Sequence, residues 1–217
     1  ERGLAYDCGC TRAEVARAAG APDASDPAEA AVYAGTCRRG LAPGRAARAV
    51  RFRAPEGSIA FEDRVRGRVE EDVARAVGDF VVKRADGPFA YQLAGVVDDG
   101  AQGVTEVVRG GDLLSSTARQ LALQRALGLP EPSYAHLPLV LGPDGKKRGK
   151  RDGALPLETL DGRRVAETLA LALRLLGQKV AGETPAEMLA GAARAFDAAR
   201  VPAGPLRVGP DGEILSG

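Results

Sequence analysis

Two of the three cysteines in the chain, Cys8 and Cys10, flank a single glycine in the sequence YDCGC. A disulfide between them would be strained, because a disulfide needs two Cα atoms about 4.4–6.8 Å apart with Cβ atoms aimed toward each other. Two thiols at this spacing are better suited to share a third group, such as a metal ion. The rest of the chain must then supply the other ligands.

Cys37 and Tyr33 are the candidates for these further ligands. They stand four residues apart, so a helix would place both on one face. With the two thiols of the C-x-C sequence they would form a closed structural zinc site. A phenolate is an unusual ligand, because a pKa of about 10 requires the metal to drive deprotonation. Three ordinary thiols and a buried tyrosine remain an open alternative, since C-x-C is a weaker zinc signal than paired C-x-x-C motifs.

The other candidate residues have ordinary structural interpretations when each is taken alone. Arg109 precedes two glycines and is typical of a surface turn, whereas Tyr91 is typical of a half-buried strand residue. The run KKRGKR at 146–151 is typical of a basic turn. The single histidine, His136, has no carboxylate or second histidine beside it in SYAHLPLV, which favours a structural role.

The composition of the chain excludes some classes of protein. With 217 residues and 45% hydrophobic content, the chain can bury a core as one large or two small domains. Its 30 basic and 29 acidic residues nearly cancel, so any binding to nucleic acid would depend on local patches. An odd number of cysteines favours a reducing compartment, and no apolar run approaches the roughly 18 residues of a membrane helix. We therefore expect a cytoplasmic protein that does not enter a membrane.

Local patterns predict the elements that must position these residues. Thr11-Arg12-Ala13-Glu14 is a capping box that begins a helix ending at Gly20, and a second helix-like segment runs from Pro27 to Cys37. Runs rich in β-branched residues predict four strands. They are Val50–Arg53, Asp79–Lys83, Tyr91–Val97 and Thr105–Val108. Hydrophobic periodicity predicts three helices. The first runs from a cap at Ser115 or Ser116 to Gly128, and the other two span 163–177 and 185–200. This pattern predicts an α/β sheet followed by a helical layer.

Four segments resemble the glutamyl-tRNA synthetase group of class I aminoacyl-tRNA synthetases. They are YDCGCTRAEV, YAGTCRRG, GDFVVKRADGPFAYQLAGVVDDGAQGVTEVVRGGDLLSSTARQLALQRALGLP and HLPLVLGPDGKKRGKRDGA, so the resemblance is nearly continuous from Tyr6 to Leu157. It implies the second half of a Rossmann-like catalytic domain, with a zinc-bearing insertion arm and a short C-terminal helical layer. The implied domains are the arm at 1–78, the catalytic half at 79–145, and the signature loop with the helical region at 146–217.

Within this group, the chain is similar to the shortened glutamyl-Q tRNA(Asp) synthetase branch. FAYQLA stands where glutamyl-tRNA synthetases more often have a Tyr-Asn-Phe-Ala type sequence, and the 67 residues after Lys150 are too few for an anticodon-binding domain. The resemblance implies a monomeric enzyme that activates L-glutamate with ATP and Mg²⁺. This enzyme would transfer glutamate to queuosine in the anticodon loop of tRNA(Asp). The alternatives are a fragment of an ordinary glutamyl-tRNA synthetase and a zinc-stapled, noncatalytic RNA-binding or interaction module.

The resemblance also implies two sets of ligand-binding residues. The zinc ligands would be Cys8, Cys10, Tyr33 and Cys37. The glutamate side chain would meet Tyr91 and Arg109. A guanidinium suits a carboxylate because it offers two parallel charge-assisted hydrogen bonds, and a phenol can complete the shell.

The resemblance places the ATP signature loop in the basic run. The loop residues would be Lys147, Arg148, Gly149, Lys150 and Arg151. Lys150 would meet the ATP phosphates, while Gly149 replaces the usual serine and should leave the closed loop less preorganised. The chain shows no HIGH-type motif, so by this resemblance it looks like a synthetase without the amino-terminal segment that carries the motif. The residues that could hold phosphates of the anticodon loop are Arg38, Arg39, Lys146 and Lys147.

Overall fold

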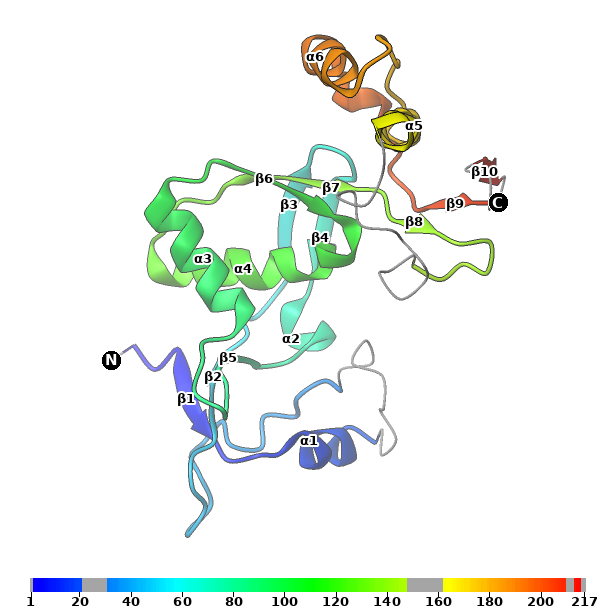
Figure 1. Cartoon of the computed structure of the whole chain (residues 1–217). Coiled ribbons are helices and arrows are strands. Elements are labelled where there is room, and N and C mark those ends of the chain that lie inside the picture. The colour runs from blue at the N-terminus through cyan, green and yellow to red at the C-terminus, as the bar shows by residue number, and fades with distance from the viewer. Residues whose placement is uncertain (1, 21–30, 148–161, 210–212, 216–217) are drawn as a thin grey trace. The chain divides into compact units, whose positions relative to one another are not determined.

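The computed structural model describes residues 2–20, 31–147, 162–209 and 213–215 (Figure 1). The chain forms two compact units, each built from segments that are far apart in the sequence. The first comprises Glu1–Phe61, Arg68–Glu106 and Ser115–Pro132. The second comprises Glu62–Gly67, Val107–Leu114 and Ser133–Gly217. The domain boundaries expected after residues 78 and 145 stay predictions.

The first unit contains a three-stranded antiparallel sheet in the order β1-β2-β5. Its strands are β1 (Ala5–Cys8), β2 (Ala49–Phe52) and β5 (Phe80–Lys83). Phe52 and Phe80 are paired in the register, and their buried rings have centroids 5.4 Å apart. The two strands predicted from Val50 and from Asp79 are therefore confirmed to within about one residue, the usual uncertainty of strand ends.

Helix α1 (Arg12–Ala18) follows β1 and begins at the predicted capping box. The Thr11 hydroxyl accepts from the backbone N–H of Glu14, and the Glu14 carboxylate accepts from the backbone N–H of Thr11 at 2.7 Å. These reciprocal bonds satisfy two donors that the first turn of a helix would otherwise leave unpaired. The short helix fixes the chain directly after Cys10.

The segment around Tyr33 and Cys37 differs from the sequence prediction. Residues 21–30, where the second helix was expected to begin, lie outside the described residues. Tyr33 forms an isolated parallel bridge with Gly78, and Cys37 lies in a turn instead of a helix. Gly35 has a φ of +77°, in the left-handed region that interrupts a helix, so the predicted helical spacing of Tyr33 and Cys37 is wrong.

Helix α3 (Tyr91–Gln102) replaces the strand predicted at Tyr91–Val97. The prediction gave weight to β-branched residues, but strand propensity depends strongly on packing partners. Val96 is buried, and the side-chain amide of Gln92 donates to the Ser116 hydroxyl at 2.9 Å on helix α4 (Leu114–Leu127). Packing between the two helices thus outweighs a weak local preference. Helix α4 confirms the predicted helix but begins at Leu114, so Ser115 and Ser116 lie inside it and the predicted cap is wrong.

A second sheet has the strand order β4-β3-β7-β6. Its strands are β3 (Ile59–Asp63), β4 (Gly67–Glu71), β6 (Glu106–Gly110) and β7 (Ser133–Leu137). The sequence predicted only β6 among them. Strands β3 and β7 run parallel, with Asp63 opposite Tyr134. A short helix, α2 (Val73–Ala76), follows β4 and is capped by Asp72.

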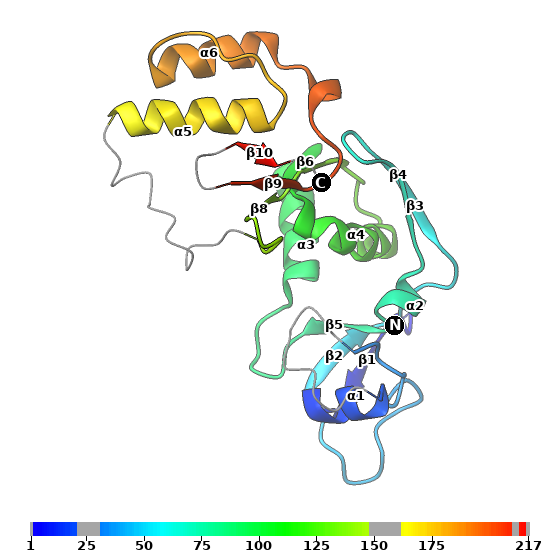
Figure 2. The ribbon, with the colours of Figure 1, turned by 90° about the vertical axis from the view of Figure 1, so that its right-hand side faces the viewer.

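The C-terminal region confirms the two predicted helices, with shorter bounds. Helices α5 (Gly162–Leu175) and α6 (Pro185–Ala195) lie side by side in Figure 2. Their contact buries Ala170, Leu173, Met188 and Ala192. Strand β9 (Leu206–Val208) pairs with β8 (Val140–Leu141) and with β10 (Ile214–Leu215), and none of these three was predicted. None of the described helices is long and apolar enough to cross a membrane.

Candidate metal centre and substrate-binding residues

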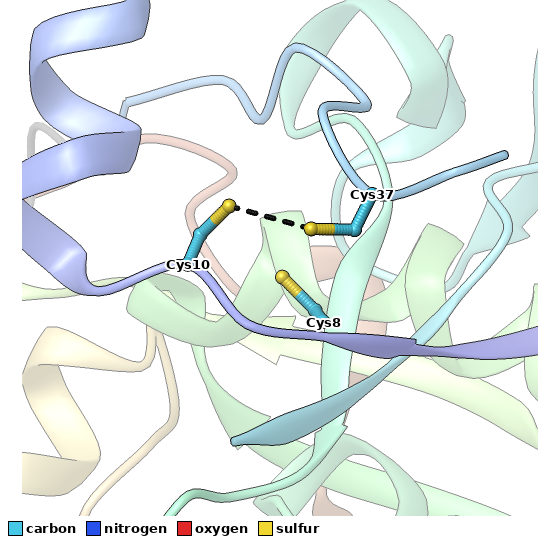
Figure 3. A group of neighbouring side chains, drawn as sticks. All are labelled: Cys8, Cys10 and Cys37. Atoms are coloured by element: carbon cyan, nitrogen blue, oxygen red, sulfur yellow. Dashed lines mark hydrogen bonds between the residues drawn. The ribbon is translucent and has the colours of Figure 1, made fainter. Parts of the chain in front are cut away.

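The three cysteines converge in the first unit (Figure 3). Cys8 ends β1, Cys10 lies between β1 and α1, and Cys37 approaches from the turn that follows Tyr33. The three sulfur atoms all lie within 4.8 Å of one another, and the Cys10 and Cys37 sulfurs are 3.6 Å apart. All three cysteines are free thiols, and two of them are buried. The predicted grouping of thiols is therefore present, although no helix creates it.

The phenol of Tyr33 completes this group. Its oxygen lies 3.5 Å from the Cys8 sulfur and 3.9 Å from the Cys10 sulfur, and it accepts from the backbone N–H of Cys37 at 2.8 Å. The backbone N–H of Tyr33 donates to the Val77 carbonyl at 3.1 Å, and a Cβ at the neighbouring Gly78 would lie only 2.5 Å from the Tyr33 carbonyl oxygen. The residue opposite Tyr33 must therefore lack a side chain.

The spacing of these four donors fits zinc. Tetrahedral zinc with Zn–S bonds of about 2.3 Å places two sulfurs about 3.8 Å apart, close to the 3.6 Å between the Cys10 and Cys37 sulfurs. Structural zinc sites are closed and use four protein ligands, which this set provides. We call Cys8, Cys10, Tyr33 and Cys37 the metal-centre residues.

The protonation states of the metal-centre residues are unequal. Burial alone would raise the pKa of Cys8, but hydrogen bonds, of which the one with Tyr33 is the strongest, lower it to about 7. Burial, followed by the hydrogen bond with Cys37, raises the pKa of Cys10 to about 11. Burial also raises the pKa of the Tyr33 phenol. The protein alone therefore favours one thiolate, and a cation would be needed to deprotonate the remaining ligands.

Arg51 lies beside the metal-centre residues and was missed by the sequence analysis. Its Nε donates to the Cys8 sulfur at 3.4 Å, and its guanidinium carbon lies 3.7 Å from the centroid of the Tyr33 ring. Strand β2 supplies this residue, and its Nη1 also donates to the Asp79 carbonyl at 2.7 Å. Its positive charge would compensate negative charge on these sulfur atoms when they are deprotonated.

Asp79 joins several segments around the metal centre. Its buried carboxylate accepts from the Tyr6 hydroxyl at 2.6 Å and from the backbone N–H of Ala54 at 2.9 Å, and it pairs with Arg38 at 3.2 Å. Arg38 directly follows Cys37, so the carboxylate fixes the turn that carries this cysteine. Arg38 and Arg39 also line a surface cavity of about 520 Å³.

Arg109 belongs to strand β6 in the second unit. The surface turn that the local sequence favours for this residue is therefore wrong. Its Nε donates to Nε2 of His136 at 3.0 Å, and its Nη2 donates to the Leu113 carbonyl at 3.3 Å. The guanidinium carbon is 5.4 Å from the centroid of the Tyr134 ring. These contacts orient the guanidinium from several sides.

His136 is fully buried on β7 and has a carboxylate partner. Its Nδ1 lies 2.6 Å from Oδ2 of Asp63, 73 residues earlier in the sequence. The expectation that no carboxylate stands near His136 is therefore wrong, because the parallel pairing of β3 with β7 brings one to it. Burial lowers the pKa of His136, which keeps the ring neutral at physiological pH.

A family model described as tRNA synthetases class I (E and Q), catalytic domain, matches residues 1–205. The chain belongs to this family. The match covers both the metal-centre residues and the strands that carry Arg109 and His136. It confirms the class I synthetase fold with mixed α/β sheets that the sequence resemblance implied.

Curated relatives within this synthetase family are about half identical to the chain. A glutamyl-Q tRNA(Asp) synthetase from Geobacter sulfurreducens is 52% identical, and the match covers 92% of this chain and 65% of the relative. The proteins of the same name from Aromatoleum aromaticum and Thiobacillus denitrificans are 53% and 47% identical, with 81% and 94% of this chain covered. The chain spans 53–67% of the length of these three relatives.

Solved synthetase structures have a similar fold. The glutamate-tRNA synthetase of Elizabethkingia anophelis matches with a TM-score of 0.60 and 27% identity, over 76% of this chain and 37% of that one. A glutamate tRNA ligase from Elizabethkingia meningosepticum, in complex with its amino acid, matches with a TM-score of 0.58 and 27% identity, over 73% of this chain and 36% of that one.

The remaining synthetase residues implied by the sequence fall in different parts of the chain. Tyr91 begins α3 in the first unit and is 54% exposed, whereas Arg109 belongs to the second unit. Lys147 forms an ion pair with Asp112 within the second unit. The other signature-loop residues, Arg148, Gly149, Lys150 and Arg151, lie outside the described residues.

Proposed function

We propose that the full-length protein containing this chain activates L-glutamate with ATP and transfers it to queuosine in the anticodon of tRNA(Asp). The observation that carries this proposal is the 52% identity, across 92% of the chain, to a relative named glutamyl-Q tRNA(Asp) synthetase. A guanidinium oriented by a buried histidine and carboxylate in the second unit supports it, because such a group suits an amino acid with an acidic side chain.

In the proposed first step, glutamate binds through its side-chain carboxylate to Arg109. The planar guanidinium can form two parallel hydrogen bonds with a carboxylate, which a lysine cannot do. The resemblance alone adds the phenol of Tyr91, at the beginning of α3, as a proposed contact of glutamate. Recognition of this kind discriminates against glutamine, because an amide would place N–H groups against the N–H groups of Arg109.

The activation step joins the glutamate α-carboxylate to the α-phosphate of ATP. A carboxylate oxygen attacks the α-phosphorus, the bond to the bridging oxygen breaks, and pyrophosphate leaves with that electron pair. Lys150 would stabilise the charge on the phosphates, with Mg²⁺ accompanying ATP as it does in most ATP sites. Lys147, at the start of the signature loop, pairs with Asp112 and would exchange this partner for a phosphate.

In the transfer step, a hydroxyl of queuosine attacks the carbonyl carbon of the glutamyl-adenylate. The new ester bond forms as AMP leaves with the electrons of the mixed-anhydride bond, and the hydroxyl proton passes to solvent or to the departing phosphate. The basic residues proposed to hold the anticodon loop are Arg38, Arg39, Lys146 and Lys147. Because the net charge is only +1, binding should depend on these local contacts and weaken at high salt.

The metal-centre residues would hold one structural zinc ion, which stabilises the arm and takes no part in the chemistry. The support is the donor set of three thiols and a phenol, with the sulfurs within 4.8 Å of one another. A closed site of this kind contributes its binding free energy to folding. Loss of zinc should therefore disorder the segment that carries Arg38 and Arg39.

Glutamate-dependent exchange of labelled pyrophosphate into ATP tests the activation step. The full-length protein should catalyse this exchange without any tRNA, and glutamine and aspartate should not replace glutamate. Absence of exchange in a full-length protein that is folded and loaded with zinc would instead support a noncatalytic RNA-binding module. Exchange that requires tRNA would contradict the proposed order of steps.

A further inference from the structure

Asp63, His136 and Arg109 form a continuous chain of hydrogen bonds within the second unit. The bond between the carboxylate and the imidazole is 2.6 Å long, and the bond between the imidazole and the guanidinium is 3.0 Å long. Three strands of the same sheet supply these residues, namely β3, β7 and β6. We call this chain the Asp63–His136–Arg109 relay.

The direction of every bond in the relay is determined by its chemistry. Arginine Nε can only donate, so Nε2 of His136 must accept with its lone pair. The proton of a neutral His136 must then lie on Nδ1, where it is donated to Asp63. The imidazole is therefore held in one tautomer, between an acceptor on one side and a donor on the other.

The position of the carboxylate in the relay is fixed by the backbone. Oδ1 of Asp63 accepts three backbone N–H groups, those of Val65, Arg66 and His136, at 3.0, 2.8 and 3.2 Å. Oδ2 is thereby directed at Nδ1 of the imidazole. A carboxylate anchored in this way cannot rotate without breaking several bonds in a buried site.

The surroundings of His136 keep its ring neutral. Arg66 donates to the His136 carbonyl at 3.2 Å, and the Tyr134 ring stacks on the imidazole at an interplanar angle of 13°. Burial is the largest influence and lowers the pKa of His136, and the charges of Arg109 and Arg66 act in the same direction. The Asp63 carboxylate opposes them, but the net pKa shift is downward.

We propose that Asp63 and His136 are positioning residues that hold the guanidinium of Arg109 in the orientation required to bind a ligand carboxylate. Because Nε is committed to His136, the carboxylate would pair with the Nη end of the guanidinium. This inference rests on the proposed function, in which Arg109 recognises L-glutamate. Asp63 and His136 would act through Arg109 and would not touch the substrate.

The relay should strengthen glutamate binding because it orders the Arg109 side chain before the ligand arrives. An arginine side chain has several rotatable bonds, and ordering it during binding costs free energy that is saved when the protein has already ordered it. Bidentate pairing also depends on the angle of the guanidinium plane. A misplaced guanidinium should weaken glutamate binding by up to about 100-fold without any loss of charge.

The substitution Asp63→Asn tests the relay because it changes the hydrogen-bond direction and little else. The asparagine oxygen can keep accepting the backbone N–H groups, which places its NH₂ group against Nδ1 of His136. The imidazole must then accept at Nδ1 and carry its proton on Nε2, facing the N–H of Arg109. Two donors would oppose each other, so Arg109 should leave its position.

Two variants of His136 separate positioning from packing. In His136→Gln, the amide oxygen can still accept from Arg109, whereas His136→Phe keeps a flat ring beside Tyr134 but offers no acceptor. Positioning predicts that the glutamine variant retains more glutamate affinity than the phenylalanine variant. A purely structural role predicts the reverse order, because phenylalanine preserves the stacked ring and glutamine does not.

The experiment measures the KM for glutamate and for ATP by pyrophosphate exchange in the full-length protein, together with the melting temperature. The KM for glutamate should rise by up to about 100-fold in Asp63→Asn, while the KM for ATP stays near its original value. Asp79→Asn is the matched control, because Asp79 is a similarly buried carboxylate with backbone and arginine partners in the first unit. It should lower the melting temperature and leave the KM for glutamate unchanged.

Nitrogen-15 NMR of the imidazole supplies a readout that does not depend on activity. The His136 signals, assigned by their loss in His136→Gln, should show the neutral Nδ1–H tautomer, and Asp63→Asn should shift the proton to Nε2. An Nε2–H tautomer in the unaltered protein would overturn the relay even if glutamate binding is confirmed.

The outcomes distinguish the relay from the proposed function. Loss of glutamate activation in Arg109→Ala with normal glutamate KM in Asp63→Asn would reject the relay and keep the role of Arg109. Equal changes in KM for glutamate and ATP would assign Asp63 a structural role only. Absence of any glutamate-dependent exchange in the unaltered protein would reject the proposed function, and the NMR result would then decide whether the relay orients Arg109.

Discussion

The metal-centre residues and the Asp63–His136–Arg109 relay are both largely buried clusters of ionisable groups, but their charges are balanced in opposite ways. The metal centre combines three thiols and a phenol, all of which become anionic on deprotonation, and Arg51 is the cation that contacts it. The relay places a neutral imidazole between a carboxylate and a guanidinium. With its donors deprotonated, the first cluster would need an added cation, whereas the second contains its own compensating charges.

This difference predicts different consequences when each cluster is disturbed. A site that depends on an added ion should lose much of its local folding free energy when that ion is removed. A self-compensated hydrogen-bond chain should keep its fold after an isosteric change and lose the orientation of one side chain. The comparison thus predicts that the first cluster would help to fold the arm and that the second would orient a binding residue.

The largest expected effect is that of removing the metal. Protein purified without chelator should contain close to one zinc per chain, and Cys37→Ala should lose the metal along with apparent binding free energy on the order of 10 kcal/mol. Metal analysis and calorimetric melting measure both quantities. Thr36→Ala, at the exposed neighbouring position, is the control that should keep the zinc. A zinc-free protein with an unchanged melting temperature would remove the distinction between the clusters.

The next largest effect is expected for the guanidinium of Arg109. Arg109→Ala should weaken glutamate activation by about 2–5 kcal/mol, because the ligand carboxylate would be desolvated without a partner. ATP binding should stay near normal, and Arg109→Lys should rescue poorly because a point charge lacks the planar fork. Arg163→Ala, which removes an exposed arginine paired with Glu167, is the control. Equal exchange activity in the unaltered protein and in Arg109→Ala would exclude this residue from the glutamate site.

A smaller effect is expected for Arg51, the cation beside the metal centre. Arg51→Ala should lower zinc affinity by about 10- to 100-fold, as substitution of residues that contact metal ligands often does. Competition with a chromophoric chelator measures this change. Arg53→Ala is a matched control, because Arg53 also lies over a tyrosine ring, that of Tyr6, but donates to the backbone carbonyls of Gly3 and Arg38 instead of to a cysteine sulfur. Identical zinc affinities for the two variants would show that Arg51 only packs on Tyr33.

The smallest effect is the pH dependence of stability contributed by the relay. Burial lowers the pKa of His136 below its usual 6.5, and hydrogen bonds from His136 and the backbone overcome burial to lower the pKa of Asp63 below its usual 3.8. The unfolded chain therefore binds more protons than the folded one at acidic pH. Each group's contribution is complete above its unfolded pKa and is lost as pH falls toward its folded pKa.

Urea unfolding between pH 7.5 and pH 4 measures this dependence. The free energy of unfolding should fall below about pH 6.5, with a slope of at most about 1.4 kcal/mol per pH unit for each proton. His136→Gln should flatten the part of the curve between pH 6.5 and pH 5, because glutamine does not titrate. A curve with the same shape in both proteins would indicate that His136 is not held neutral in the folded state.

The two clusters also differ in how far the sequence could predict them. Cys8 and Cys10 are one residue apart, so their spacing already indicates a shared ligand. Tyr33 and Cys37 were grouped with them for the wrong local reason, since a turn at Gly35 replaces the predicted helix. Arg51 could not be found in this way, because the pairing of β1 with β2 brings it to the cluster.

The relay has no short spacing for sequence analysis to detect. Asp63 and His136 meet because two unpredicted strands pair in parallel, and such pairing depends on the whole chain. The interpretation of Tyr91–Val97 as a strand failed for a related reason, because helix packing outweighed local propensity. The three long helices α4, α5 and α6 were predicted, although their bounds differ from the predicted ones, and α4 is buried on several sides instead of along one face.

Mapping the position of transferred glutamate is the most direct test of the proposed function. Labelled glutamate, ATP and the full-length protein are incubated in turn with queuosine-containing tRNA(Asp), the same tRNA lacking queuosine, and tRNA(Glu), and each RNA is then digested with nucleases. The account predicts label on the anticodon fragment of queuosine-containing tRNA(Asp) and none on the other two RNAs. Label on the terminal adenosine of tRNA(Glu) would contradict it and show an ordinary glutamyl-tRNA synthetase.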